Sequence, residues 1–574
     1  MNRFTRRVIS VIIVILFTSF NQDSAISSLG IPTRNSIPPR LQVTVSADKS
    51  SAKVGELITF HGSAKGSPIE PTYRWDFDAS DGIDVDKFAA NPTYVFGKPG
   101  NYIVTLTVQG LDGSFGQKTL RMKISQRNYV KHEAIVNSNC HGTEADPIVI
   151  EGFEISSKFG NGIELIDCSW VVIRNNYIHD IGVQDIDTYV DGHAISATRV
   201  SHLVIEGNII TDNFRGIWIN ATPKDEDEQD IRITGNRVEG STANHAISIW
   251  KASQVVVNGN ISLNNGTAAL FQNYRVNGVA LWDCQHAKVF DNLAIGNSTD
   301  GFGASRTIVI PDYKNTPTTD ISFSRNVARQ NGEQGIWLRL VDHALVSDNY
   351  IADNAKVVGM HPANGIFFED GVNNSEVVGN YSSNNVYNEI EIWGSKDVDV
   401  HANVLQPKTD VGIGVEGGIE ADTNTKLYTS NVHVHNNIIR GGTYGIQIGD
   451  TNGVTVTGNS VLASSEVGIQ VSDKALNSLV AGNIVYGSAG DSYLVTLHSE
   501  LAPNIQWLNM ISQSNKWFSK LDPKFMNYNL GDSRLMNNSP ALKFADLRYI
   551  RCSIGFKFAP AGAWCGNVLS REPW

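Results

Sequence analysis

The segment Val204-Ile205-Glu206-Gly207-Asn208 decides the fold, because versions of it return along most of the chain. Val256-Val257-Asn258-Gly259-Asn260 and Val456-Thr457-Gly458-Asn459 are two further copies, and each places asparagine after an alternating apolar stretch. A period of two within each copy predicts strands rather than helices. The asparagines recur every 22 to 34 residues, with the shortest intervals at 22 to 24, at Asn176, Asn208, Asn236, Asn260, Asn292, Asn326, Asn349, Asn380, Asn403, Asn437, Asn459 and Asn483. A repeat of this size indicates a solenoid.

This pattern runs from Phe159 to Leu497 and resembles the right-handed parallel β-helix of the pectin-lyase-like superfamily. The resemblance implies an all-β fold of about a dozen coils. One coil cannot bury its apolar face alone, so we expect the coils to stack around a continuous core, with asparagines bonded from coil to coil. Glycine before asparagine suits a corner with a left-handed residue. Lyases, hydrolases, esterases, epimerases and adhesins share this fold, so the fold by itself does not give the activity.

The composition limits the partners and the location of the protein. Apolar residues make up 41% of the 574 residues, which suffices for a large core, and the net charge is −12. Such a charge argues against nucleic acid and anionic membranes as partners. Residues 1–25 combine three arginines with the apolar run Val8 to Phe20, which is short for a membrane span, and predict a signal peptide. An uncleaved anchor is the alternative. We expect a monomer that is secreted or at the cell surface, away from the membrane after signal cleavage.

A second, smaller domain precedes the solenoid. Residues 41–126 follow a linker at 26–40 and have the short strands and glycine-rich turns of a β-sandwich. Trp75-Asp76-Phe77-Asp78, Pro92-Thr93-Tyr94 and the run from Pro99 to Val108 resemble a polycystic-kidney-disease (PKD) domain. The resemblance implies an Ig-like sandwich that acts as a spacer or as a weak polysaccharide binder, and the spacer role is favoured.

The β-helix itself is assigned to residues 127–500 and a C-terminal cap to residues 501–574, because the ends of a solenoid need covers. Cys552 and Cys565 can form a disulfide in an exported chain. Cys140, Cys168 and Cys284 then leave an odd thiol. Cys168 and Cys284 occupy similar places in their coils, where a small buried residue fits.

Two columns of side chains are expected on one outer face of the coils. Aligning the copies on the strand Gly-Ile-x-Ile sends alternate residues outward, with adjacent coils about 4.8 Å apart. The first column is Glu164, Ser196, Trp218, Ser248, Ala280, Trp337, Phe367 and Glu391, and the second is Trp250, Trp282, Arg339, Glu369, Trp393 and Glu416.

The tryptophans in these columns indicate a surface for sugar rings, whose C–H faces stack on flat aromatic groups. We therefore expect a polysaccharide substrate to bind at Trp218, Trp250, Trp282, Trp337, Arg339, Glu369 and Trp393. Long insertions before this strand support a groove, since loops on a rigid scaffold commonly carry sites. The alternative is that loops cover these tryptophans as a satellite core, because exposed aromatic patches are otherwise rare.

His193, Arg215 and His245 precede the same strand in three successive copies, each two residues before the first inward residue. If the turn exposes them, they line a groove. A lyase or C5-epimerase on a uronic-acid polysaccharide needs a cation for the carboxylate, a base for the C5 proton and an acid. A histidine of ordinary pKa can fill either proton-transfer role near neutral pH. The alternative is that these side chains only satisfy the backbone of the turn.

Two other classes remain open. A glycoside hydrolase uses paired carboxylates, and Glu369-Asp370, Asp283 and the outward acids Glu391 and Glu416 favour it. A non-catalytic carbohydrate-binding surface protein is favoured by the PKD-like domain and by the lack of a complete enzyme motif. A loop with Asp185, Asp187 and Asp191 can supply oxygen ligands for Ca²⁺. No spacing along the chain resembles a zinc site.

Overall fold

The computed structural model describes residues 40–66, 71–78, 84–110, 114–182, 192–221, 229–266, 276–307, 318–354, 363–420, 425–495, 499–501, 504–507, 518–519, 525–527 and 532–535. The predicted signal peptide, the aspartates at 185, 187 and 191, the cysteines at 552 and 565 and most of the predicted cap lie outside these residues. The described residues contain strands and no helix, and hence none long and apolar enough to cross a membrane.

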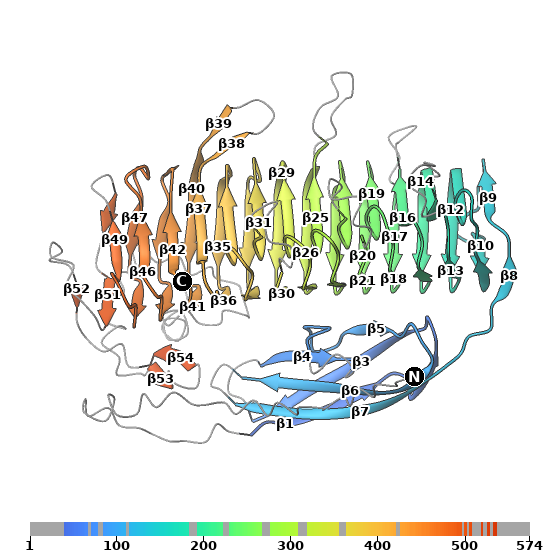
Figure 1. Ribbon diagram of the computed structural model, residues 1–574, viewed down its shortest axis with the longest axis horizontal. Coiled ribbons are helices and arrows are strands. Elements are labelled where there is room, and N and C mark those ends of the chain that lie inside the picture. The colour runs from blue at the N-terminus through green and yellow to red at the C-terminus, as the bar shows by residue number, and fades with distance from the viewer. Residues whose placement is uncertain are drawn as a thin grey trace, which may run out of the picture. The chain divides into compact units, whose positions relative to one another are not determined.

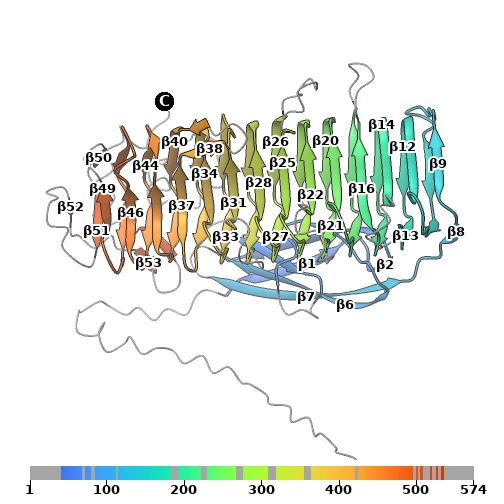
Figure 2. The same cartoon turned by 45° about the horizontal axis from the view of Figure 1, so that its top comes forward.

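A parallel β-helix accounts for most of the described residues, with three strands in a typical coil. The first and second strands of the coils join in one 27-stranded sheet, and the third strands form a 16-stranded sheet. Figures 1 and 2 show the strands of neighbouring coils side by side. The predicted all-β solenoid is therefore confirmed.

The first strands of the coils are β9 (Ile135–Ser138), the first halves of β12 (Ile163–Arg174) and β14 (His193–Glu206), β16 (Arg215–Asn220), β19 (Ile247–Trp250), β22 (Val279–Trp282), β25 (Phe302–Ser305), β28 (Ile336–Arg339), β31 (Ile366–Glu369), β34 (Ile390–Trp393), β37 (Val411–Glu416), β42 (Tyr444–Ile448), β46 (Val467–Val471) and β49 (Tyr493–Val495). The second strands are β10 (Ile148–Glu151), the second halves of β12 and β14, β17 (Ile231–Thr234), β20 (Ser253–Asn258), β23 (Gln285–Phe290), β26 (Thr318–Ser324), β29 (Val341–Ser347), β32 (Ser375–Val378), β35 (Lys396–His401), β40 (Thr429–His435), β43 (Thr451–Asn452), β44 (Thr455–Thr457), β47 (Leu479–Ala481) and β50 (Glu500–Leu501).

The third strands are β8 (Val130–His132), β11 (Phe153–Ile155), β13 (Tyr177–His179), β15 (Ile209–Thr211), β18 (Arg237–Glu239), β21 (Ile261–Leu263), β24 (Leu293–Ile295), β27 (Val327–Arg329), β30 (Tyr350–Ala352), β33 (Tyr381–Ser383), β36 (Val404–Gln406), β41 (Ile438–Arg440), β45 (Ser460–Leu462), β48 (Ile484–Tyr486), β51 (Asn504–Trp507) and β52 (Phe518–Ser519). Two short hairpins, β38 (Gly418–Glu420) with β39 (Thr425–Leu427) and β53 (Phe525–Asn527) with β54 (Asp532–Leu535), stand apart from these sheets.

The core follows from the register of the first strands. Ile217 pairs with Ile247 in the next coil, and Ile247 pairs with Val279. These side chains are buried and belong to one cluster that runs through the whole β-helix. Because equivalent residues stack directly, each coil covers the apolar face of the next.

The asparagine ladder is present as predicted. In one step, the backbone N–H of Asn236 donates to Oδ1 of Asn260 at 2.9 Å, and Nδ2 of Asn236 donates to the same oxygen at 3.0 Å. The same pair of bonds links every step from Asn176 to Asn483. Gly235, before Asn236, has a φ of 60°, which is the left-handed corner expected from the sequence.

A second asparagine ladder, which the sequence did not predict, runs beside the first at the turn after the third strands. It links Asn265, Asn297, Asn331, Asn354 and Asn385 through side-chain bonds of 2.9 to 3.0 Å. The last asparagine donates to Oε2 of Glu389, which also accepts from Ser382. Burial raises the pKa of the Glu389 carboxyl to about 7, although these hydrogen bonds oppose the rise.

The sandwich comprises β1 (Gln42–Ala47), β2 (Ser51–Lys53), β3 (Leu57–Lys65), β4 (Thr72–Asp76), β5 (Thr93–Val95), β6 (Gly100–Gln109) and β7 (Phe115–Ser125). Its two sheets have the orders β1-β3-β5 and β2-β7-β6-β4. Trp75 and Phe77, both in the stretch that carries the PKD resemblance, are buried and stack at 5.9 Å. The sandwich core also includes apolar residues of the third strands, among them Ile261 and Leu293.

The cysteines differ in part from expectation. Cys140 and Cys168 form a disulfide, whereas Cys168 was expected only to be a small buried residue. Cys168 is buried as well, since its strand carries it inward. Cys284 is the free thiol among the described residues, and burial raises its pKa to about 12, so it is an inert core residue.

Candidate functional site

The register of the first strands confirms the two outward columns. Trp250 pairs with Trp282, and Arg339 pairs with Glu369. One coil was missing from the predicted columns. Strand β25 places Gly303 between Ala280 and Trp337, and Ser305 between Trp282 and Arg339. Strand β25 does not match the Gly-Ile-x-Ile pattern, because Phe302 and Ala304 stand where other coils have inward isoleucines.

The aromatic residues divide into a covered layer and a half-exposed layer. Trp218, Trp250, Trp282 and Trp393 are half-buried, whereas Trp337 is 3% exposed. The rings of Trp250 and Trp282 stack at 5.2 Å with an interplanar angle of 18°. Half-exposed stacked indoles offer apolar faces to a ligand at low entropic cost, because their neighbours already fix them.

Trp337 fixes a carboxylate instead of offering its own face. Its Nε1 donates to Oε2 of Glu369 at 2.6 Å. The ring lies 6.1 Å from that of Trp282, so it supports the half-exposed layer from beneath. Arg339, in the second column, pairs through Nη2 with Oδ2 of buried Asp370 at 3.0 Å. Asp370 is therefore engaged in an ion pair, and Glu369 is the member of the Glu369-Asp370 pair that belongs to the outer face.

Glu391 has an unusual environment among the outward acids. Its side chain is 6% exposed, and Nδ2 of Asn364 donates to its Oε2 at 2.5 Å. Burial raises the pKa of the Glu391 carboxyl to about 7; the Asn364 bond opposes this, and the charges of Glu416 and Glu369 add to it. A carboxylic acid that is partly protonated at neutral pH and has carboxylates nearby is a candidate for proton transfer.

Glycines leave room around this acidic cluster. A Cβ on Gly414 would lie 2.8 Å from Nδ2 of Asn388, beside Glu391, and one on Gly449 would lie 3.0 Å from Cγ of Glu416. Burial also raises the pKa of Glu416. The local sequence therefore places small residues where the carboxyl groups need space.

His193, Arg215 and His245 lie in successive coils, as expected. Strand pairing matches His193 with Arg215, and the pairing of Ile217 with Ile247 puts His245 at the equivalent place in the next coil. The ring of His193 stacks on Trp218 at 5.4 Å, and that of His245 lies 6.1 Å from Trp282. Both histidines thus lie beside outward tryptophans, although they are 8% and 6% exposed.

The protonation of His193 differs from the expectation of an ordinary pKa. Burial, reinforced by the charge of Arg215, lowers the pKa of His193 to about 3. Nδ1 of His245 accepts the backbone N–H of Asn277 at 2.9 Å, so the neutral ring carries its proton on Nε2. His193 is therefore neutral at pH 7 and a weak base, and His245 is oriented as a hydrogen-bond donor.

Polar side chains in the same register support the turn in other coils. Oδ1 of Asn161 accepts the N–H of His193 at 2.9 Å, and Oδ1 of Asn364 accepts the N–H of Asn388 at 3.0 Å. Gln334 and Asp300 act in the same way. These side chains therefore hold the turn of one coil against that of the next.

Asp283, another of the predicted acids, directly follows Trp282 of the second column. Asp283 accepts the N–H of Thr307 at 2.8 Å and is buried. A hollow of about 590 Å³ is lined by turn residues of the first coils, including Ser156, Asp180 and Phe214, and by no column residue. Among the described residues, one group with metal-binding side chains occurs, at Asp399, His401 and His435 on the second strands.

Comparison with known proteins fixes the family. The family model "Right handed beta helix region" matches residues 100–224, 188–307 and 319–485, and a PKD domain model matches residues 42–124. The chain belongs to the right-handed β-helix family. Both predicted domain types, with the handedness of the coil, are thereby confirmed.

Solved structures similar to this β-helix protein include proteins of different activities. The A-module of the Azotobacter vinelandii mannuronan C-5 epimerase AlgE6 shares 13% identity, with 67% of this chain and 92% of that chain covered and a TM-score of 0.33. The Yersinia enterocolitica family 28 exopolygalacturonase shares 12%, with 82% and 99% covered and a TM-score of 0.30. A tailspike of the Escherichia coli bacteriophage HK620, solved with a pentasaccharide, shares 11%, with 59% and 60% covered and a TM-score of 0.34. At these identities and TM-scores, the similarities assign no activity to this chain.

Proposed function

We propose that this β-helix protein is an exported glycoside hydrolase that binds a polysaccharide along the outward columns and uses Glu391 as general acid. The observation that carries the proposal is the buried Glu391 carboxyl group, which accepts from Asn364 and lies one coil from Glu369 and one coil from Glu416. Its burial raises the pKa of Glu391 to about 7. Paired carboxyl groups with separated pKa values are the chemical requirement of glycosidic hydrolysis.

Substrate binding is assigned to the half-exposed indoles of Trp250, Trp282 and Trp393. Their faces suit the C–H faces of sugar rings, and the stack between Trp250 and Trp282 keeps them in place. The net charge of −12 and the acids of the outward columns favour an uncharged polysaccharide over a polyanion.

In the proposed reaction, the protonated Glu391 donates its proton to the glycosidic oxygen as the bond to the anomeric carbon breaks. Glu369, held by Nε1 of Trp337, or Glu416 then acts on the opposite side. In an inverting reaction this second group takes a proton from the water that attacks the anomeric carbon. In a retaining reaction it attacks the anomeric carbon itself, and water deprotonated by Glu391 then cleaves the glycosyl ester and frees the carboxylate.

A lyase or C5-epimerase is the second candidate, and the register of His193 with Arg215 favours it. Arg215 would hold a uronate carboxylate through its planar fork of donors, and His245 would donate from Nε2. The low pKa of His193 makes it a poor base for the C5 proton, which is why the hydrolase is preferred.

One experiment separates these activities from simple binding. The secreted chain is incubated with a panel of neutral and uronic-acid polysaccharides, and both reducing ends and ultraviolet absorbance are followed. A hydrolase yields reducing ends without absorbance, whereas a lyase yields an absorbing double bond, and C5 inversion appears in the NMR spectrum of the product. Binding without any of these products would contradict both enzymatic assignments and support a carbohydrate-binding surface protein.

A further inference from the structure

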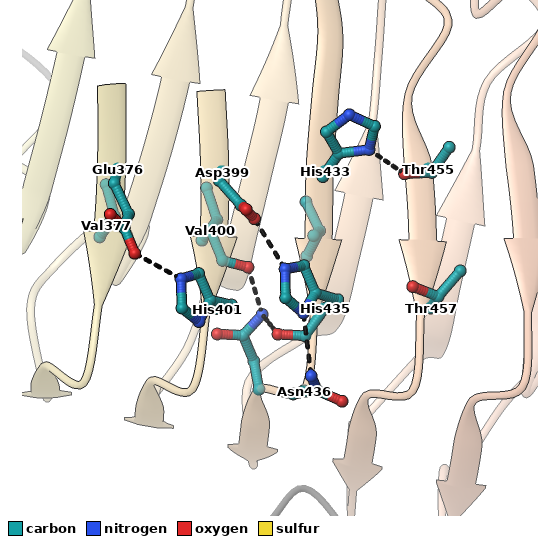
Figure 3. A network of polar contacts seen from close by, with 12 residues as sticks. Glu376, Val377, Asp399, Val400, His401, His433, His435, Asn436, Thr455 and Thr457 are labelled. Atoms are coloured by element: carbon teal, nitrogen blue, oxygen red, sulfur yellow. Dashed lines mark hydrogen bonds and ion pairs between the residues drawn. The ribbon is translucent and has the colours of Figure 1, made fainter. Parts of the chain in front are cut away.

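A cluster of histidines and carboxylates lies on the second strands of the coils, away from the outward columns. His401 ends β35 and His435 ends β40, and the two are register partners in adjacent coils. Their rings stack with centroids 4.8 Å apart and an interplanar angle of 3°. Figure 3 shows the ring of His401 beside the carboxylate of Glu376 and the ring of His435 beside the carboxylate of Asp399.

The cluster brings potential ligand atoms close together. One donor atom each from Asp399, His401 and His435 lies within 4.8 Å of the other two. Nε2 of His401 is 2.6 Å from Oε1 of Glu376, which supplies a further oxygen from the preceding coil. Nε2 of His435 is 2.8 Å from Oδ1 of Asp399. Asp399, His401 and His435 thus offer two imidazole nitrogens and one carboxylate oxygen, and Glu376 contacts this group through His401.

The donor set selects a class of cation. Zinc accepts imidazole nitrogen and carboxylate oxygen in tetrahedral sites, and other divalent first-row transition metals share these ligands. Calcium and magnesium prefer sites made of oxygen atoms alone. The rings are 4% and 6% exposed, so the nitrogens are held in place by packing.

Two buried oxygens in the cluster have little or no hydrogen bonding among the described residues. Oδ1 of Asp399 has only the ion-pair contact with Nε2 of His435 at 2.8 Å, and Oδ1 of Asn436 accepts no hydrogen bond. Unsatisfied buried oxygens are costly, so they call for a ligand or a different arrangement.

A turned amide at Asn436 and a cation beside Asp399 would together give both oxygens a partner. Nδ2 of Asn436 lies 2.9 Å from Nδ1 of His435. The oxygen and the nitrogen of an amide have nearly the same shape, so the amide can be turned over without changing the packing. With the amide turned over, Oδ1 of Asn436 accepts a hydrogen bond from the Nδ1–H of His435. The lone pair on Nε2 of His435 is then available to a metal. Metal-bound histidines commonly donate their other ring proton to such an acceptor. Oδ1 of Asp399 then binds the same cation.

We propose that Asp399, His401 and His435, with Glu376 as fourth donor, bind a divalent transition-metal ion of the zinc type. The site lies on β32, β35 and β40, so the ion joins three successive coils through their side chains. Because an ion bound only to the folded coils stabilises them, its expected role is structural.

The test uses the full chain without a histidine tag, stripped of metal by a chelator. Zn²⁺ binding is measured by competition with a chromogenic zinc indicator, and the metal content by elemental analysis. We expect one ion per chain, a higher melting temperature with Zn²⁺, and a visible absorption band of tetrahedral Co²⁺ when Co²⁺ replaces Zn²⁺. Calcium at millimolar concentration should not compete, since the nitrogen ligands disfavour it.

Four variants locate the ion. His401→Ala and His435→Ala should weaken Zn²⁺ binding by more than the roughly 10- to 100-fold typical for loss of an outer partner, and Asn436→Gly should fall within that range. His433→Ala is the matched control, because His433 is on β40 but its Nδ1 lies 2.6 Å from Oγ1 of Thr455.

Melting curves without metal establish that each variant is folded. If a histidine variant fails to fold, Asp399→Asn replaces it and should also weaken binding, with loss of the Co²⁺ band. The proposal is overturned if the wild-type chain binds no Zn²⁺, if both ligand variants bind as tightly as the wild type, or if His433→Ala loses binding equally.

Discussion

The side chain of Asn364 joins two coils at the acidic end of the outward columns. Its Nδ2 donates to Oε2 of Glu391 at 2.5 Å, while its Oδ1 accepts the backbone N–H of Asn388 at 3.0 Å. Asn364 thus orients the carboxyl group and leaves it buried enough for its pKa to rise to about 7. This arrangement leads to the first two predictions.

Replacing Glu391 by glutamine should abolish hydrolysis while leaving the fold intact. The amide cannot give up a proton to the leaving oxygen, so turnover should fall by about 10²-fold or more. Glu164→Gln is the matched control, since Glu164 lies in the same column in a distant coil. Initial rates of reducing-end release measure the effect. Normal turnover in Glu391→Gln would remove this residue from the mechanism.

The pH dependence of activity follows from the same group. A general acid acts while protonated, and Glu391 loses its proton as the pH rises through about 7. We therefore expect kcat/KM to decrease above pH 7. The midpoint of this decrease gives the pKa of the general acid in the free enzyme. A profile measured between pH 5 and 9 tests this. A rate that instead rises through this range would point to a basic group and favour the lyase candidate.

Stability should also fall with pH because of buried acids. The folded-state pKa of Glu389 is raised from 4.5 to about 7, so the native state holds its proton more tightly than the unfolded chain. Its contribution to the free energy of unfolding is about 3 kcal/mol. This contribution is complete below about pH 4.5 and is lost as the pH rises through 7. Glu391 acts with the same sign.

Denaturant unfolding at pH 5 and pH 8 measures this loss. Glu389→Gln cannot titrate, and its loss of stability between the two pH values should be smaller than that of the wild type by roughly 3 kcal/mol. Comparing the two slopes, rather than absolute stabilities, cancels any cost of the altered hydrogen bonds to Asn385. Identical slopes would show that Glu389 titrates normally in the folded chain.

Trp282 should contribute to polysaccharide binding. Its half-exposed ring stacks on Trp250, and Trp282→Ala should weaken binding by about 1–3 kcal/mol with a small change in melting temperature. Trp170→Ala is the control, because Trp170 stacks on His202 outside the outward columns. Affinity electrophoresis or calorimetry gives the comparison. Unchanged binding with a large fall in melting temperature would identify Trp282 as satellite core.

The asparagine ladder should be essential for stability. Asn260→Ala removes the acceptor for the N–H and Nδ2 of Asn236 and the donor to Ile233 O. Because each unsatisfied buried group costs roughly 1–3 kcal/mol, we expect a loss of about 3 kcal/mol or more. Asn452→Ala, at an exposed amide that bonds Asn477, should change stability by less than about 0.5 kcal/mol. Equal effects in the two variants would contradict the ladder's role.

The ladder and the columns could be predicted because they repeat. Asn236 and Asn260 carry the same signal 24 residues apart, and alternation then fixes which residues turn inward. The coil with Phe302 was missed because its residues depart from the pattern. The cluster of Asp399, His401 and His435 was missed for a related reason, since His435 stands in the coil after Asp399 and His401 and insertions of different length separate the coils.

The sequence by itself determined the β-helix, the PKD-type sandwich, the stacked asparagines and the two outward columns, because each depends on periods that one coil already contains. Only the tertiary structure decided the chemistry of individual groups. The pKa values of Glu391 and His193, the bond from Asn364 and the cluster around His401 depend on burial and on neighbours in other coils. Burial and coil-to-coil distance arise only when the coils stack, and the local pattern carries no record of them.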